Sequence, residues 1–383
     1  MTDFGIRTAT LQDPPFLLRD STLREGLECP VAQIQQPSLS RVAAQLAALG
    51  IRAIEVVGPG DSQLGLSLLA ELRPLGHLVK SAILNVESRE RQERLNQLAE
   101  AAVDEVDLLL HVSGIRLGGS SLGPPVCPPV KRVRDVFSSS KGDAQSAGIT
   151  RVGIGLGDVF RAKPDFVCSI IESLCMLNPC RFVLYDTVGV ALPQEVGALI
   201  AQLARISSIP LHVHFHNDLG MATANTLIAI QSGASGADVT VGGVGDRCGN
   251  ASLEVVALVA ERRLGIKTGV QLADLTRICR SVLELLAIPV APCAPIFGPL
   301  AFCHSASSHY AQLLRGHKEA YEPYPPETVG QTRRFLVDAS REMEEALREY
   351  SLERGYSPGR LARLVADHRG KTVSEAELED LLK

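Results

Sequence analysis

Short apolar runs alternate with longer amphipathic stretches along residues 16–264, and the unit repeats about every 30 residues, the spacing of a βα repeat. The short runs are rich in valine, isoleucine and leucine, which predicts strands that are buried on both faces. The expected strands are residues 16–22, 53–57, 78–84, 105–112, 151–156, 181–187, 211–217 and 238–244.

The stretches between these runs carry apolar residues at three- and four-residue steps, which is the period of one helix face. Clear examples are Leu39, Val42, Ala43, Leu46 and Leu49, then Val196, Leu199, Ile200 and Leu203, then Leu253, Val256 and Val259. Strands and helices are therefore expected to alternate through this part of the chain.

Eight strand–helix units within about 250 residues predict a (β/α)8 TIM barrel, an α/β fold, rather than an open doubly wound sheet. No Gly-x-Gly-x-x-Gly follows the first expected strand, which counts against a dinucleotide-binding fold. We expect an N-terminal arm over residues 1–15, the barrel over 16–285 and a small helical subdomain over 286–383. That last segment is charged and ends in an apolar run that includes Val373 and Leu378.

A chain of 383 residues that is 45% hydrophobic can form one large core and a smaller appendage. Its net charge is −5 and its basic residues are scattered, so we expect neither nucleic acid nor an anionic membrane as a partner. The sequence contains no apolar run of about 18 residues and no signal-peptide pattern, which predicts a cytoplasmic protein. The nine cysteines, without a Cys-x-x-Cys, fit reduced thiols.

Three histidines alternate along the seventh expected strand, at His212, His214 and His216. Alternate side chains share one face of a strand, so the three imidazoles line one side. Two neutral imidazoles on neighbouring rungs can bind one divalent metal, and nitrogen ligands suit Zn, Mn, Fe or Co better than Ca. A strand with core histidines is the alternative, and we expect that hydrogen-bonded core role for His212.

The end of the first expected strand carries the charged residues Asp20, Arg24 and Glu25. Glu25 can complete a two-histidine, one-carboxylate metal site that leaves positions open for substrate. Arg24 can polarise a carbonyl or hold an enolate oxygen, because a guanidinium stays charged and donates in a fixed fork. A surface ion pair is the alternative interpretation of this segment.

Other polar residues also fall at the ends of expected strands or directly after them, on the face where TIM barrels carry their active sites. They are Asp186 and Thr187 at the end of the sixth strand and residues 246–250 after the eighth. Glu55 lies within the second strand. The candidate chemistry therefore gathers at one end of the predicted barrel.

Six segments resemble motifs of the metal-dependent TIM-barrel Claisen synthases and lyases. These segments are residues 20–26, 185–189, 214–218, 243–251, 304–309 and 321–324. They are similar, in that order, to Asp-x-Thr-Leu-Arg-(Asp/Glu)-Gly, Asp-Thr-Val-Gly, His-x-His-Asn-Asp, a glycine-rich Arg-x-Gly-Asn loop, His-x-Ser-Gly-x-His and Tyr-Glu-Pro-Phe. The superfamily includes isopropylmalate, homocitrate and citramalate synthases and hydroxymethylglutaryl-CoA lyase. The resemblance covers about residues 16–335.

The resemblance implies a divalent metal (Mn, Zn, Co or Mg) bound by Glu25, His214 and His216. It places Asn250 near enough to be a further ligand or a neighbour of the ligands. It also implies that Arg24 polarises the 2-oxo group of a substrate and stabilises the oxyanions that develop.

The implied reaction is a Claisen condensation of acetyl-CoA with a 2-oxo acid, followed by hydrolysis of the thioester. Its products are a 2-hydroxy-2-(carboxymethyl) acid and CoA. By the resemblance, His309 acts as acid or base on the acetyl group, within its own subunit or across a homodimer, and Tyr321 lies beside it. The paired motifs of the C-terminal segment favour a synthase over a lyase. Substrate contacts are expected at Asp20, Glu28, Arg116 and Thr187.

Three departures from the pattern predict an atypical 2-oxo acid. Glu28 replaces a neutral glutamine, and a carboxylate there would repel a substrate carboxylate. Gly153 aligns with an arginine of homocitrate synthases, which removes a cation. Arg116 stands where synthases often have a histidine, and it could supply that cation or simply reach water.

Two other functions stay open at this point. Gly26 and Leu27 resemble the lyase branch, which favours a carbon–carbon lyase or aldolase of the hydroxymethylglutaryl-CoA lyase type. Glu28 and Gly153 would also suit a non-catalytic metal-binding homologue. His304 is ambiguous, because a helix-capping or packing role would suit it as well as a functional one.

Overall fold

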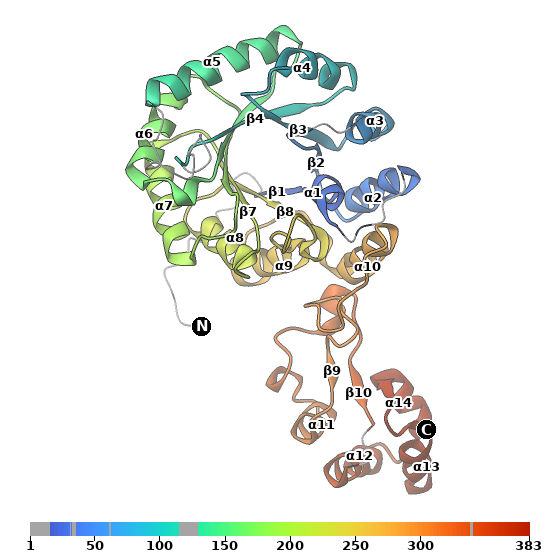
Figure 1. Cartoon of the computed structure of the whole chain (residues 1–383). Coiled ribbons are helices and arrows are strands. Elements are labelled where there is room, and N and C mark those ends of the chain that lie inside the picture. Colours follow the sequence, from blue (N-terminus) through green and yellow to red (C-terminus); the bar gives the residue numbers. More distant parts are fainter. Residues whose placement is uncertain (1–15, 31, 33–35, 61–62, 115–128, 338–339) are drawn as a thin grey trace. The chain divides into compact units, whose positions relative to one another are not determined.

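The computed structural model of the chain describes residues 16–383 except 31, 33–35, 61–62, 115–128 and 338–339. The expected N-terminal arm and Arg116 therefore lie outside the described residues. The chain divides into two compact units, which we call the barrel unit and the C-terminal unit (Figure 1). The barrel unit runs to Val270 and includes Ser281–Pro289, and the C-terminal unit comprises Gln271–Arg280 and Val290–Lys383.

Eight parallel strands close a barrel in the order in which they occur along the chain, which confirms the predicted (β/α)8 fold. The strands are β1 (Leu17–Asp20), β2 (Ala53–Val57), β3 (Val79–Asn85), β4 (Glu105–His111), β5 (Val152–Gly157), β6 (Phe182–Asp186), β7 (Leu211–Phe215) and β8 (Gly236–Val239). Every residue of β2, β6 and β7 is buried, because helices cover the outer face of the barrel and side chains fill its interior.

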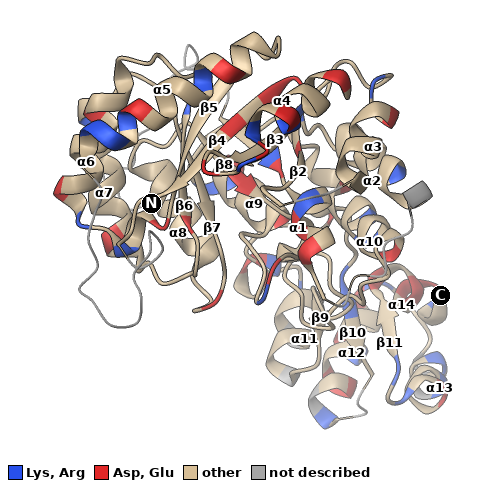
Figure 2. Ribbon diagram, turned by 45° about the horizontal axis from the view of Figure 1, so that its top comes forward, with Lys and Arg blue, Asp and Glu red and all other residues tan. Residues whose placement is uncertain are grey.

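Helices surround this barrel, and basic and acidic residues are interspersed along them (Figures 1 and 2). They are α1 (Thr22–Glu28), α2 (Gln36–Ala48), α3 (Gln63–Glu71), α4 (Arg91–Glu100), α5 (Val130–Ser146), α6 (Pro164–Cys175), α7 (Pro193–Ile206), α8 (Ala222–Gln231) and α9 (Leu253–Arg263). The next helix, α10 (Leu275–Leu285), has residues in both units. Among the described residues, no helix is long and apolar enough to cross a membrane.

Helix α7 illustrates how the predicted pattern forms its element. It begins at Pro193, whose fixed φ suits the first turn, and the Glu195 carboxylate accepts a hydrogen bond from the Leu192 amide at 3.0 Å. The face predicted to be apolar is the one that is buried, with Val196 and Leu203 among its residues. The expected apolar face of α2 is also buried, whereas in α9 Leu253 and Val256 are buried and Val259 is only partly buried.

The first and last barrel strands are shorter than predicted at their carboxyl ends. β1 stops at Asp20 instead of residue 22, because the Asp20 carboxylate accepts a hydrogen bond from the Thr22 amide (2.9 Å) and the chain turns into α1. β8 stops at Val239 instead of residue 244. A 3-10 turn follows it at Val241–Gly243, where Gly242 and Gly243 adopt positive φ angles of 65° and 68°.

Glycines on β5 leave room for side chains of the neighbouring strands. A Cβ on Gly153 would overlap the carboxylate of Asp107, and one on Gly155 would lie 2.9 Å from the ring of Tyr185. Position 153 therefore has no space for an arginine while Asp107 occupies it. The absence of that cation, noted in the sequence, is accommodated by the packing of β4 against β5.

The C-terminal unit contains helices and a small sheet around its own apolar core. Its helices are α11 (Ser307–Leu314), α12 (Arg341–Glu353), α13 (Pro358–His368) and α14 (Glu375–Leu382). A three-stranded sheet, β9 (Cys303–His304), β10 (Arg334–Leu336) and β11 (Thr372–Ser374), accompanies them. The sequence predicted only helices here and placed Val373 in the last helical run, since strands of two or three residues are too short to show alternation.

Candidate metal centre

Glu25 is positioned by the tight turn that ends β1. The Asp20 carboxylate accepts hydrogen bonds from the amide and the hydroxyl of Thr22, at 2.9 and 3.0 Å, and so starts α1. Glu25 lies in the first turn of that helix and is completely buried. Burial also raises the pKa of Asp20 to about 7, against the lowering effect of its bonds to Thr22.

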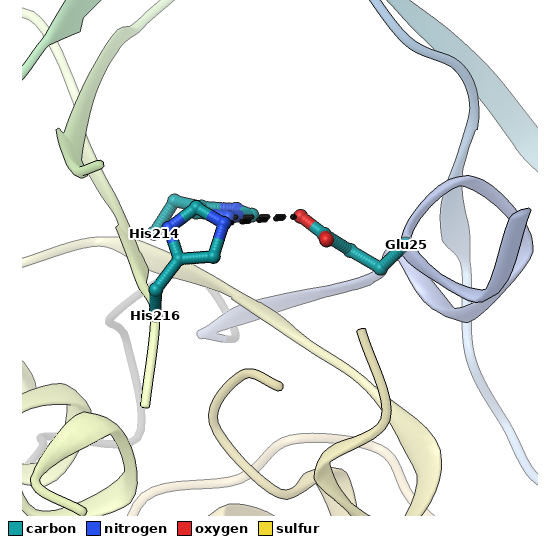
Figure 3. A group of neighbouring side chains, drawn as sticks. All are labelled: Glu25, His214 and His216. Atoms are coloured by element: carbon teal, nitrogen blue, oxygen red, sulfur yellow. Dashed lines mark ion pairs between the residues drawn. The ribbon is translucent and has the colours of Figure 1, made fainter. Parts of the chain in front are cut away.

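The two predicted histidine ligands face Glu25 from the carboxyl end of β7 (Figure 3). His214 Nε2 lies 3.1 Å and His216 Nε2 lies 3.8 Å from Glu25 Oε1. One ligand atom from each of the three side chains lies within 4.8 Å of the others. Residues about 190 positions apart thus meet as the sequence predicted, although Glu25 belongs to a helix and not to a strand end.

Both imidazole rings are oriented through their other nitrogen. His214 Nδ1 lies 3.0 Å from Asp238 Oδ2, and His216 Nδ1 lies 3.0 Å from the carbonyl oxygen of Asp186. A carbonyl oxygen only accepts, so His216 carries its proton on Nδ1 and directs the Nε2 lone pair toward Glu25. This arrangement, with an acceptor behind each metal-facing imidazole, is the one that metal-binding histidines use.

The centre favours a positive charge between its ligand atoms. Burial by itself lowers the pKa of His214, but hydrogen bonds and charges from Asp238 and Glu25 outweigh it and raise the pKa to about 9. Burial lowers the pKa of His216 to about 4, so this ring is neutral at pH 7. A carboxylate oxygen and an imidazole lone pair that point at each other require a proton or a cation between them. The donor set therefore fits a divalent metal.

A glycine-rich loop after β8 brings Asn250 to the same place. The Asn250 side chain is buried, with its Nδ2 3.1 Å from His214 Nε2 and its Oδ1 without a hydrogen-bond partner. A Cβ on Gly245 would overlap that Oδ1 and lie 3.2 Å from Glu25 Oε2. The loop thus orients Asn250, and its unpartnered amide oxygen suits a further metal ligand.

Arg24 supplies a fixed positive charge next to the three ligands. Its Nε donates to Glu55, and its Nη2 lies 2.5 Å from Glu25 Oε1. Burial by itself lowers the pKa of Arg24, but Glu25 and the other nearby carboxylates raise it above its ordinary value, so the side chain is a permanent cation. It can polarise a carbonyl bound beside Glu25.

Below the ligands, a buried ion network fills the barrel interior, and sequence reasoning missed it. Arg19 Nε and Nη2 donate to Asp238 at 2.7 and 2.9 Å, and its Nη1 lies 2.5 Å from Asp107. Arg19 and Asp238 are paired directly between β1 and β8. Asp238 also accepts from His212 at 2.7 Å, which confirms the core role expected for that histidine. Charged residues at inward-facing strand positions were the available signal.

The predicted substrate contacts lie at different places around this centre. Glu28 is 43% exposed and its Oε2 lies 3.7 Å from Arg24 Nη1. Burial raises the pKa of Glu28, and this effect exceeds the lowering by Arg24. Thr187 follows β6, and its hydroxyl accepts a hydrogen bond from the Asp158 amide at 2.9 Å. The Asp20 carboxylate is engaged by Thr22, as described above.

The predicted acid–base residues belong to the C-terminal unit and lie together there. The rings of His309 and Tyr321 stack with their centroids 3.8 Å apart, as the sequence motifs implied. His304 Nδ1 lies 3.1 Å from His309 Nδ1. The unit therefore holds a histidine pair next to a tyrosine.

Comparison with known proteins shows the family of the chain. The HMGL-like family profile matches residues 16–282. The chain is 30% identical over 358 residues to 2-isopropylmalate synthase of Haemophilus influenzae, covering 89% of this chain and 66% of that protein. It is 30% identical over 389 residues to a putative (R)-citramalate synthase of Methanopyrus kandleri, covering 97% and 74%. It thus spans about two thirds to three quarters of the length of these relatives.

Solved structures agree on the fold. Hydroxymethylglutaryl-CoA lyase from Pseudomonas aeruginosa matches with a TM-score of 0.60 at 21% identity, over 72% of this chain and 94% of that one. From the profile match and the 30% identical relatives, the chain belongs to the HMGL-like family, within the TIM-barrel Claisen synthases and lyases that its motifs resemble.

Proposed function

We propose that this protein condenses acetyl-CoA with a 2-oxo acid and then hydrolyses the thioester, which releases CoA and a 2-hydroxy-2-(carboxymethyl) acid. The observation that carries the proposal is the buried group of Glu25, His214 and His216 with the Arg24 cation beside it. Relatives that are synthases by name, at 30% identity, support it.

Glu25, His214 and His216 would hold a divalent metal (Mn, Zn, Co or Mg), with Asn250 as a further ligand. When bound, such a metal supplies Lewis-acid polarisation of the 2-oxo group. The chain contributes the orientation, since Asp238 and the Asp186 carbonyl hold the two rings. Burial of all these groups removes the competing water that would weaken their charges.

Arg24 would stabilise the negative charge that develops on the substrate oxygen. Its partners Glu55 and Glu25 hold the guanidinium in place, so little reorganisation is needed when the oxyanion forms. Glu28 lies on the exposed side of Arg24 and would face the acceptor. With a carboxylate there, we propose an acceptor that carries a donor or a positive group near that end, or one without a second carboxylate.

His309, with Tyr321 beside it, would move the proton in the first step. The base removes a proton from the methyl group of acetyl-CoA, and the resulting carbanion forms the carbon–carbon bond at the 2-oxo carbon. Water then cleaves the thioester and CoA leaves as the thiol. Contacts of Asp20, Thr187 and Arg116 with substrate stay predictions, as do the homodimer and the cytoplasmic location.

A carbon–carbon lyase of the hydroxymethylglutaryl-CoA type is the second candidate. Gly26 and Leu27, which follow Glu25, match the lyase pattern. Both residues lie in α1, the helix that also carries Glu25. A lyase would form acetyl-CoA or pyruvate from one substrate. A metal-binding homologue without turnover is the third possibility, and it is distinguished by the absence of either reaction.

A panel of 2-oxo acids tests the proposal. Purified protein with Mn or Co is mixed with acetyl-CoA and each acid, and free thiol is measured over time. We expect thiol release only when both substrates are present, and its loss on chelation. If no acid in the panel gives free thiol, the synthase assignment is overturned. A homologue without turnover should bind metal poorly, so metal analysis of the same protein separates it from a synthase and from a lyase.

A further inference from the structure

A row of polar contacts in the C-terminal unit leads from a buried ion pair to His309. Arg333 Nε and Nη2 donate to the two carboxylate oxygens of Glu322 at 2.7 and 2.6 Å. Glu322 Oε1 lies 3.4 Å from His304 Nε2, an ion-pair distance without hydrogen-bond geometry, and His304 Nδ1 lies 3.1 Å from His309 Nδ1. We call Arg333, Glu322, His304 and His309 the His304 relay.

The fold brings these residues together and buries the inner three. β9 pairs in parallel with β10, with His304 opposite Phe335, and Arg333 directly precedes β10. His304 and Glu322 are each 7% exposed and Arg333 is 3% exposed. Arg333 also donates to Glu375, which lies 3.6 Å from Lys318. The ion pair at the inner end of the relay is therefore held from both sides.

The proton positions along the relay follow from this anchored end. A carboxylate gripped by a guanidinium is ionised and can only accept hydrogen bonds. A neutral His304 therefore carries its proton on Nε2, because a lone pair there would face the negative charge of Glu322. His304 Nδ1 is then an acceptor, and His309 Nδ1 must donate to it. This leaves the Nε2 lone pair of His309 available as a base.

Other neighbours are consistent with this assignment. Burial lowers the pKa of His304, against the raising effect of Glu322, so the ring is neutral at pH 7. The Tyr321 ring, stacked on His309, holds the plane of that imidazole. His304 and Tyr321 also line a cavity of about 360 Å³ together with Tyr324, so the relay borders a space within its own unit.

We propose that His304, anchored by Glu322 and Arg333, is a positioning residue that fixes His309 as the Nδ1-protonated tautomer. The inference rests on the proposed function, in which His309 takes a proton from the acetyl group. That proton goes to His309 Nε2, and the positive charge that results is stabilised through His304 by the Glu322 carboxylate. No other bond forms or breaks in this step. The relay thus performs the orienting role that a carboxylate performs directly in other histidine bases.

The competing explanation is that His304 only packs. Its ring lies 6.3 Å from the ring of Phe335, and an aromatic residue of similar size would preserve that contact. His304→Phe therefore keeps the packing and removes both nitrogens. Glu322→Gln is the complementary variant, because its amide can donate to His304 Nε2 and thereby reverse both tautomers. His317→Asn is the matched control, since His317 is an exposed histidine of the same unit.

The first measurement is independent of any substrate. Nitrogen-15 NMR of the full-length, histidine-labelled protein reports the tautomer of each ring, and His309→Gln identifies the His309 signals. We expect the Nδ1-protonated tautomer in the wild type and in His317→Asn, and the Nε2-protonated tautomer in Glu322→Gln. An Nε2-protonated His309 in the wild type, or no change in Glu322→Gln, would overturn the relay whether or not the synthase assignment holds.

The second measurement uses the 2-oxo acid that supports thiol release. We expect His304→Phe to lower kcat about 100-fold, within the range of general acid–base effects, with KM for both substrates changed less than about twofold. The acidic limb of the kcat–pH profile, where protonation of the base abolishes activity, should also move. A rise in KM with unchanged kcat would show that His304 is structural. If the wild type releases no thiol, the proposed function is contradicted, but the NMR result on the His309 tautomer is unaffected.

Discussion

The barrel unit and the C-terminal unit each orient a histidine with an arginine-held carboxylate. In the barrel, Arg19 grips Asp238 through two hydrogen bonds of 2.7 and 2.9 Å, and Asp238 accepts from Nδ1 of His214. In the C-terminal unit, Arg333 grips Glu322 in the same two-bond geometry, at 2.7 and 2.6 Å. A bidentate pair of this kind fixes both the charge and the direction of the carboxylate.

The two sites differ in what the last imidazole faces. His214 directs its Nε2 toward the Glu25 carboxylate. The imidazole nitrogen and the carboxylate oxygen can therefore bind one cation between them. In the other unit a second ring stands between the carboxylate and His309. In the proposed function, an arginine-held carboxylate therefore orients a metal ligand in the barrel unit and a base in the C-terminal unit.

We expect the largest effect from removal of the His214 imidazole, which faces Glu25. We expect His214→Ala to lose its metal and to slow thiol release at least about 1000-fold, because ligand and template are lost together. Metal content per chain and initial rates measure this, with His317→Asn as the control. Full metal content in His214→Ala would contradict the assignment of the ligands.

Removing the carboxylate from each site compares the anchors themselves. Asp238→Asn should lower the free energy of unfolding by about 3 kcal/mol, because it breaks a fully buried ion pair and turns one of the two oxygens that accept from the histidines into a donor. Glu322→Gln should lower it by about 1.5 kcal/mol, because Arg333 keeps Glu375 as a partner. Urea unfolding of metal-free protein measures both, and equal effects would contradict the ranking.

The pH dependence of stability tests the charge on His214 at the barrel site. The pKa of His214 is raised to about 9, so its charge adds stability below the ordinary histidine pKa of about 6.5. That contribution is lost as the pH rises through about 9, because the folded protein binds a proton that the unfolded chain has released. Unfolding curves of metal-free wild type and His214→Gln at several pH values test this. The prediction is refuted if the difference in the free energy of unfolding between wild type and His214→Gln does not change between about pH 6.5 and about pH 9.

A smaller effect is expected from a change in the loop that carries Asn250, and it tests whether that loop positions Asn250 for metal binding. Gly245→Ala would push its methyl group into the Asn250 amide oxygen and toward Glu25. We expect metal affinity to fall about 10- to 100-fold, the effect typical of displaced neighbours of a metal site. Gly142→Ala is the control, because that glycine lies in α5 with open space around it and should be neutral or stabilising. Metal titration of both variants gives the comparison.

Sequence reasoning reached the barrel and its ligand set for different reasons. Apolar runs and helical periods are local signals, so the alternation of β1–β8 with helices was visible without any contact. Glu25 was found through a motif. Its helix begins at Thr22, the last residue of the segment predicted as a strand. The error came from the Asp20 carboxylate, which ends the strand through a side-chain bond that no period reveals.

The fold class and the family could be predicted from the sequence, together with a set of candidate metal and proton residues, because these depend on residue types at short spacings. Only the tertiary structure decided which acceptor stands behind each ring, namely Asp238 for His214 and, through His304, Glu322 for His309. Such partners lie on other strands or in other turns, and the pairing of β1 with β8 and of β9 with β10 brings the arginines that hold them. The physical reason is that a hydrogen bond depends on distance in space, and spacing along the chain does not encode it.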